Sequence, residues 1–131
     1  MFLNFWRSTK TYARHDMITA SLLLNLAVLI PVCLGLIMDA ERVEKTAGVF
    51  TPARGVLLAM YLTIAITSLL LLFLNEPKWV FALLFLQIVY KVLTPFTVKT
   101  LKNPIVISNL GIALFHCITV FTMLQDRVIV F

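Results

Sequence analysis

The side chains most able to do chemistry in this chain are a few polar groups that interrupt long apolar runs. His116 carries an imidazole, Asn25 and Gln87 carry carboxamides, and Thr67 adds a hydroxyl. Lys91 is the one residue of these runs with a full charge at neutral pH, apart from any charge on His116. Inside a membrane, such groups can hydrogen-bond one another across helices or bind a polar group of a ligand.

The elements that carry these side chains are four apolar runs: Met17–Met38, Gly55–Leu74, Trp79–Val98 and Ile105–Leu124. Each has the length that a helix needs to cross hydrocarbon. The chain is 61% hydrophobic and has 131 residues, more apolar surface than a soluble domain of that size could bury. The loops after the second and third runs are short, so neighbouring helices must be antiparallel. We predict an all-α membrane protein with a single domain, residues 1–131, that forms an antiparallel bundle of four transmembrane helices.

Proline marks the start of three of these helices. Thr51-Pro52 and Asn103-Pro104 each pair an N-cap residue with proline at the first helical position, and Asn75-Glu76-Pro77 is similar. The segment Met1–Trp6 is apolar and aromatic and precedes basic residues, which is typical of a short interfacial segment lying along the headgroups. In the long first loop, Asp39–Arg54, three acids lack the spacing of a calcium loop, and we expect a solvated interfacial turn of helix.

Four of the polar side chains are predicted to lie at one depth. Asn25 is about eight residues into the first span, roughly 12 Å from the face that carries the N-terminal tail. Gln87 is about eight residues into the third span from that same face, and His116 is about eight residues before the fourth span returns to it. Thr67 and Ser68 lie six or seven residues before the end of the second span. All four helices therefore contribute a polar group to one layer.

Two interpretations of this layer remain open. In the first and commoner case, the side chains hydrogen-bond across the bundle and hold it together, each link contributing less than about 2 kcal/mol. In the second, they line a pocket for a lipid headgroup, a quinone-like ring or a pigment. The candidate ligand-binding residues are then Asn25, Thr67, Gln87, Tyr90, Lys91, Asn109 and His116. We predict no catalytic residue, no metal ligand and no cofactor.

Lys91 lies about 18 Å from the tail side of its span and about 12 Å from the other, and no span contains a carboxylate to pair with it. Three outcomes are open. Its side chain snorkels to the headgroups, rests against Asn109 and backbone carbonyls, or meets an anionic group from outside this chain.

The sequence lacks the residues that several classes of function require. No span contains the acid that a small proton-coupled multidrug transporter needs, and a second span histidine for haem is missing. Clustered ligands or nucleophiles for hydrolysis are missing too, so a membrane enzyme comes last among the hypotheses. The net charge of +5 is scattered rather than interleaved with aromatics, so we expect contact with anionic lipid headgroups and no nucleic-acid partner.

The size of the chain, its four spans and its long first loop resemble those of the small DoxX-like bacterial membrane proteins. Arg54-Gly55 at the start of the second span is the nearest match to their motifs, whereas the glycine-rich helix faces of that group are missing here. The resemblance implies an antiparallel four-helix bundle in the cytoplasmic membrane and carries over no functional residue. Basic residues are balanced between the two sides, and the dominance of the first helix favours an N-terminus in the cytoplasm.

We expect a small accessory or scaffolding subunit that packs laterally in a membrane assembly, with lipids and protein partners or further copies of itself around it. The apolar exterior, the few charges and the short loops favour this function. The alternative is a binder or carrier of a lipophilic small molecule in the polar layer.

Overall fold

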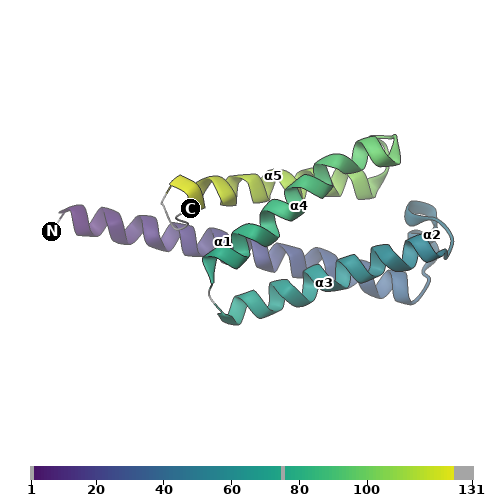
Figure 1. The fold of residues 1–131 in the computed structure, drawn as a ribbon, viewed down its shortest axis with the longest axis horizontal. Helices are drawn as coiled ribbons and strands as arrows, with labels where there is room; N and C mark the ends of the chain where they lie inside the picture. The colour runs from purple at the N-terminus through teal and green to yellow at the C-terminus, as the bar shows by residue number, and fades with distance from the viewer. Residues whose placement is uncertain (1, 75, 126–131) are drawn as a thin grey trace.

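The chain folds as an all-α bundle whose four long helices are apolar enough to cross a membrane (Figure 1). A computed structural model describes residues 2–74 and 76–125, with side chains from residue 15 onward. The helices are α1 (Phe2–Ile37), α2 (Glu41–Ala47), α3 (Pro52–Leu74), α4 (Pro77–Val98) and α5 (Pro104–Gln125). The predicted fold class is therefore confirmed, and α2 occupies the loop where we expected a turn of helix.

The helix starts follow the predicted caps. The Thr51 hydroxyl accepts a hydrogen bond from the Arg54 backbone N–H at 3.3 Å. In the same way, the Asn103 carboxamide oxygen accepts one from the N–H of Ile105 at 2.9 Å. Glu76 is the N-cap of α4 but makes no capping bond with its side chain, and Asn75 lies outside the described residues. Because proline occupies the first helical position, α3, α4 and α5 begin three, two and one residues before the predicted bounds, respectively.

The N-terminal segment differs from the expected short interfacial segment. Its backbone belongs to the same uninterrupted helix as the first span, and α1 extends past the ends of the other helices (Figure 1). The physical reason lies in the sequence, since no proline or glycine occurs between Phe2 and Ile30 to end the helix.

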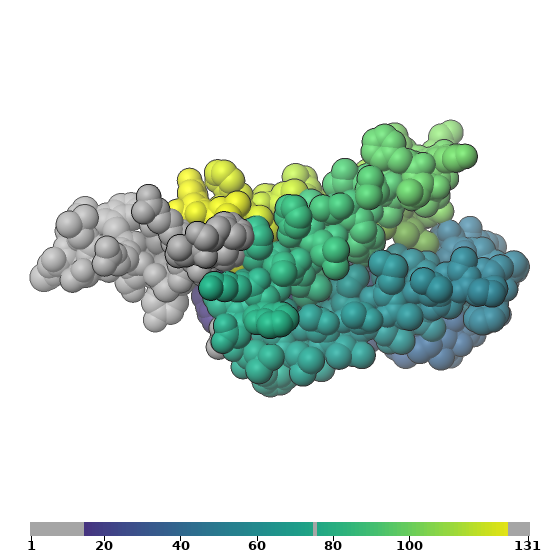
Figure 2. Space-filling model, in the orientation of Figure 1, coloured from purple at the N-terminus to yellow at the C-terminus, as the bar shows by residue number. Residues whose placement is uncertain are grey.

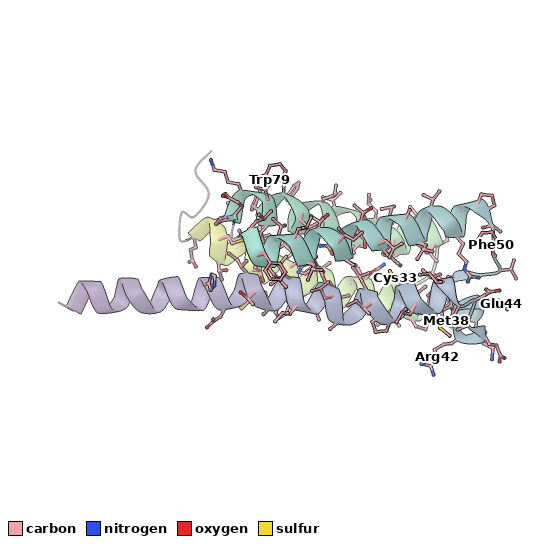
Figure 3. The ribbon with its side chains drawn as sticks, turned by 90° about the horizontal axis from the view of Figure 1, so that it is seen from below. Cys33, Met38, Arg42, Glu44, Phe50 and Trp79 are labelled. Carbon is pink, nitrogen blue, oxygen red and sulfur yellow. The ribbon has the colours of Figure 1, made fainter. Side chains whose placement is uncertain are left out.

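The four long helices form two antiparallel pairs, α1 with α3 and α4 with α5. The pairs are joined mainly where α1 packs on α5, whereas α3 and α4 touch little beyond their shared turn. We call the end of the bundle that carries α2 and the α4–α5 loop the α2 end. Cys33 points into the bundle near this end, while Trp79 is exposed at the opposite end (Figure 3).

Two apolar clusters fill the interior, one in each half of the bundle. In the half away from α2, the buried residues are Leu22, Leu71, Val80, Leu84, Val120 and Met123. Toward the α2 end, they are Leu29, Cys33, Leu36, Tyr61 and Ile64. This second cluster draws its buried residues from α1 and α3, and the half-buried Leu83 and Tyr90 of α4 pack against it.

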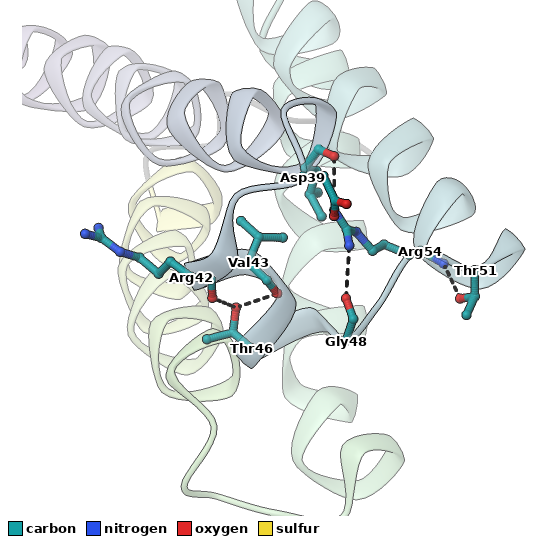
Figure 4. Close-up of polar contacts among 8 residues, drawn as sticks. Asp39, Arg42, Val43, Thr46, Gly48, Thr51 and Arg54 are labelled. Atoms are coloured by element: carbon teal, nitrogen blue, oxygen red, sulfur yellow. Dashed lines mark hydrogen bonds and ion pairs between the residues drawn. The ribbon is translucent and has the colours of Figure 1, made fainter.

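Arg54 fastens the first loop to the bundle (Figure 4). Its guanidinium is buried and forms an ion pair with Asp39 at 2.8 Å. It also donates to the carbonyl oxygens of Leu36, at 3.2 Å, and Gly48, at 3.0 Å. Leu36 lies in the last turn of α1, where carbonyls have no partner within the helix. One arginine thus closes the end of α1 and fixes the loop on both sides of α2.

Helix α2 lies close against the last turn of α1. Asp39 adopts a left-handed conformation with φ of 52°, and the Ala40 N–H bonds the Gly35 carbonyl, which turns the chain sharply after α1. A Cβ atom on Gly35 would lie 2.8 Å from Cγ2 of Val43. The close approach of α2 therefore requires glycine at position 35.

We predict that Gly35→Leu displaces α2 and lowers the free energy of unfolding by about 1–3 kcal/mol, the usual cost of overpacking. Unfolding in mixed micelles, followed by circular dichroism, measures this change. Gly111→Leu is the matched control, because a Cβ at Gly111 meets nothing within 4 Å and the residue is exposed on α5. Equal stability of the two variants would contradict the packing of α2 on Gly35.

Candidate functional site: a polar network and an adjoining pocket

Asn25 is the centre of a hydrogen-bond network that joins three helices. Its Nδ2 donates to the hydroxyl of Ser68 on α3 at 3.1 Å. Its Oδ1 lies 2.9 Å from Nε2 of His116 on α5. Since Asn25 uses its N–H group on Ser68, its oxygen accepts the Nε2–H of the imidazole. All three side chains are buried.

The network continues from the other nitrogen of His116. Nδ1 lies 3.2 Å from the hydroxyl of Ser21, which lies 2.7 Å from the hydroxyl of Thr119. With a neutral imidazole, the donors run in one direction, from Thr119 to Ser21 to His116 to Asn25 to Ser68. Thr119, Ser21, His116 and Asn25 then each donate to the next group, and the Thr119 hydroxyl uses its hydrogen on Ser21 rather than on the Phe115 carbonyl 3.3 Å away. Pairing these hydrogens within the bundle is favoured in a bilayer without internal water.

In the structure, Ser68 rather than Thr67 is the residue of the second span that joins the hydrogen-bond network. Thr67 is half-buried and forms no hydrogen bond with the described residues, whereas Ser68 is fully buried. Depth along the helix is nearly the same for these neighbours, but they point about 100° apart around it. The sequence predicted the depth and could not fix this rotation.

Two further candidates on α4 are buried without partners. Gln87 is 1% exposed, and neither atom of its carboxamide has a hydrogen-bond partner among the described residues. The hydroxyl of Tyr90 is buried and unpaired as well. Helix α4 therefore contributes to the polar layer without joining the network of α1, α3 and α5.

Lys91 remains inside the bundle instead of snorkelling. Its side chain is 2% exposed, and Nζ donates to Oδ1 of Asn109 at 3.0 Å. Nζ also lies 4.9 Å from the centroid of the Tyr90 ring. The sequence left three environments open for Lys91, and in the structure its side chain contacts Asn109. One hydrogen bond leaves other N–H groups of the ammonium available.

The backbone around Lys91 is adapted to a proline in the following turn. Pro95 has no N–H and cannot donate to the carbonyl of Lys91 four residues earlier. The Thr94 hydroxyl donates to that carbonyl instead, at 2.6 Å. A side chain thus satisfies the carbonyl that proline frees, as membrane helices with internal proline require.

Lys91 and Asn109 reach an apolar pocket of about 300 Å³ near the α2 end. Its walls come from α1, α3 and α5 and from Lys91 of α4, and α2 covers one side. Tyr61 is a further polar residue of the wall, and Asn109 Nδ2 is buried without a partner. Figure 2 shows a notch in the surface between the α4–α5 end and α3, while the Asn103 carboxamide at the start of α5 donates to the Thr46 carbonyl of α2 at 3.0 Å.

The pocket opens sideways, between α1 and α5. Pro31 of α1 and both Pro104 and Ser108 of α5 line it and are exposed. Arg42 of α2 lines the edge, and its side chain projects away from the helices (Figures 3 and 4). Since this exposed side belongs to membrane-spanning helices, the opening faces lipid rather than bulk water.

A second cavity, of about 510 Å³, lies at the opposite end among residues of α1, α3 and α4 that include His15 and Glu76. None of the residues that line it carries a buried, unpaired polar atom among the described residues. In the described part of the chain, no three His, Cys, Asp or Glu side chains lie close enough together to hold a metal ion, and we propose no metal site.

The structure therefore divides the seven candidate residues. Asn25 and His116 belong to the network, Lys91 and Asn109 to the pocket, and Gln87, Tyr90 and Thr67 to neither. The sequence interpretation missed Thr119, although its position three residues after His116 on the same helix face was a usable signal. It also missed Tyr61, although Ser68 lies seven residues later on the same buried face of α3.

Comparison with protein-family models, with curated proteins and with solved structures finds no match for this chain. The resemblance to DoxX-like proteins therefore stays a prediction.

We predict that Ser68→Ala lowers the free energy of unfolding by about 1 kcal/mol, because it leaves the buried Nδ2 of Asn25 without its acceptor. Thr67→Val is the matched control and should change that free energy by less than about 0.5 kcal/mol. Both are measured by unfolding in mixed micelles. The assignment of Ser68 to the network is wrong if Thr67→Val is the more costly substitution.

Proposed function

We propose that this multi-pass membrane protein binds a lipophilic small molecule in the pocket between α1 and α5. The observation that carries the proposal is the position of the Lys91 ammonium and the Asn109 carboxamide in the wall of an otherwise apolar cavity. Small-molecule sites in proteins have this composition, with mostly apolar walls and a few convergent polar groups.

The separation of the network from the pocket supports binding over a purely structural role. Groups that hold helices together need to be satisfied by one another, as Asn25, His116 and Ser68 are. By contrast, Asn109 Nδ2 has no hydrogen-bond partner in the described part of the chain, and the Lys91 ammonium has N–H groups that its bond to Asn109 does not use. Unpaired buried groups are costly in hydrocarbon, and a ligand that accepts hydrogen bonds from them removes that cost.

An accessory subunit that packs laterally in a membrane assembly is the second candidate. Only 22% of the most apolar stretch of α3 is buried, and Phe73, Phe85 and Phe96 point outward from α3 and α4. These faces suit contact with another membrane protein or another copy of this chain. The support is weaker than for the pocket, because lipid covers such faces equally well. Stoichiometric protein partners after gentle solubilisation would favour this candidate.

We also propose the cytoplasmic membrane as the location, with the N-terminus in the cytoplasm and membrane lipids as the immediate neighbours. The proposal rests on the resemblance in layout and on the basic residues that precede the first span.

We predict that Ser108→Phe closes the pocket and abolishes a ligand that co-purifies with the wild-type protein. Native mass spectrometry after release from micelles measures the bound mass. Ile107→Phe is the matched control, because Ile107 is the exposed neighbour of Ser108 and does not line the pocket. Equal ligand occupancy in the two variants, or no bound ligand in the wild type after addition of total lipid extract, would contradict the proposed function.

A further inference from the structure

We infer that the ligand is a single-chain amphiphile with a carboxylate head, such as a long-chain fatty acid, whose head meets Lys91 and Asn109. This inference rests on the proposed function and adds the chemical class of the ligand. It follows from the hydrogen-bonding groups of the pocket, the charge there, the depth of the site and the position of its opening.

The unused polar groups of Lys91 and Asn109 are donors. Asn109 directs Oδ1 to the ammonium of Lys91, so its acceptor is occupied, while its Nδ2, near the Tyr61 hydroxyl, makes no hydrogen bond with the described residues. Lys91 has donors only. A ligand head that fits these two residues must therefore accept hydrogen bonds, and a carboxylate offers two oxygens for this purpose.

The charge of Lys91 has no counter-ion among the described residues. The two ion pairs in that part of the chain, Lys45–Glu41 and Arg54–Asp39, both use acids at the α2 end. Asp39 is already bound to Arg54, and no acid occurs in α3, α4 or α5 or in residues 17–37 of α1. A buried ammonium without a partner is costly, whereas a carboxylate at hydrogen-bond distance compensates it. A neutral head leaves that cost in place.

The depth of Lys91 in the membrane favours a ligand with a small polar head and a single acyl chain. The residue precedes the end of α4 at Val98 by seven positions, which places its Cα roughly 10 Å from that end. A phospholipid would have to bring its phosphate and second headgroup substituent this far into hydrocarbon. A carboxylate carries no such extra polar group, and the pocket of about 300 Å³ is at the small end of ligand sites.

The opening of the pocket provides a path for the acyl chain of the ligand. Val28 and Pro31 on α1 face Ile105 on α5 across the pocket, and the wall there is apolar. An acyl chain can leave between these helices directly into the bilayer. A ligand dissolved in the membrane therefore enters sideways, head first, without crossing α2.

The test compares oleate with oleyl alcohol, which have the same chain and differ in the head. Native mass spectrometry of the delipidated full-length protein in one detergent gives the bound fraction of each ligand. Both ligands partition into micelles, but that partition is the same for every variant, so apparent affinities are compared between variants. We expect Lys91→Met to weaken oleate binding about tenfold or more and to leave oleyl alcohol within about threefold.

Asn109→Asp is a second variant, in which the Lys91 ammonium keeps a hydrogen-bond partner inside the bundle. It places a carboxylate where Oδ1 now lies 3.0 Å from Nζ, and so supplies the counter-ion from within the chain. We expect this variant to be as stable as the wild type, to lose oleate by about tenfold or more and to keep oleyl alcohol. Lys99→Met, at the exposed end of α4, is the control and should bind both ligands as the wild type does.

The outcomes separate the two proposals. If oleate binds Lys91→Met and Asn109→Asp as tightly as the wild type while Ser108→Phe blocks both ligands, the pocket stands and the carboxylate assignment is wrong. If neither oleate nor oleyl alcohol binds the wild type while a component of total lipid extract does, this inference is wrong and the proposed function stands. If nothing in the extract binds either, both are wrong.

Discussion

A side chain in hydrocarbon has no water to bond, and the arrangement of this bundle depends on how Asn25 meets that constraint. Its carboxamide has a donor and an acceptor, and each is used on a different helix, Ser68 of α3 and His116 of α5. The helix pair α1–α3 is thereby fixed to the pair α4–α5 at one level. Apolar contacts alone give little preference between helix faces in lipid, whereas these directional bonds specify which faces meet.

The pocket is a consequence of where those bonds lie. They join α1 to α5 in the half of the bundle away from α2. Toward the α2 end no such bond links the two helices among the described residues, and there the pocket separates them. Arg54 and the close contact of α2 with Gly35 hold the cover of the pocket in place. Lys91 is thus kept at the boundary between a sealed half and an open half.

Much of this arrangement was predictable from sequence because it depends on length. Proline and N-cap residues set the starts of three helices, and a constant rise per residue then places Asn25, Gln87 and His116 at one depth. Facing is harder, since it depends on how helices rotate against one another. That is why Ser68 replaces Thr67 in the network and why Gln87 is buried without a partner among the described residues.

Two features depend on contacts between distant segments and left little trace in the sequence. Lys91 had three possible environments, and the choice among them required the position of Asn109 on another helix. Arg54 was marked only by the Arg54-Gly55 resemblance, which carried over no role, yet it binds Asp39 and two backbone carbonyls. The sequence before the first span contains no proline or glycine, which is consistent with the continuous helix α1. Its aromatic composition, however, led us to predict a separate segment at the membrane interface.

The most direct measurement is solid-state NMR of the protein in bilayers, with 15N in the lysine side chains and 13C in asparagine. The structure predicts that the Nζ signal of Lys91, assigned by its loss in Lys91→Met, shows a short-range coupling to the side-chain carbonyl carbon of Asn109. It also predicts that the 31P of lipid headgroups leaves this signal unaffected. Strong dephasing of the Lys91 signal by headgroup phosphorus would contradict it, because the ammonium would then lie at the membrane surface rather than in the pocket.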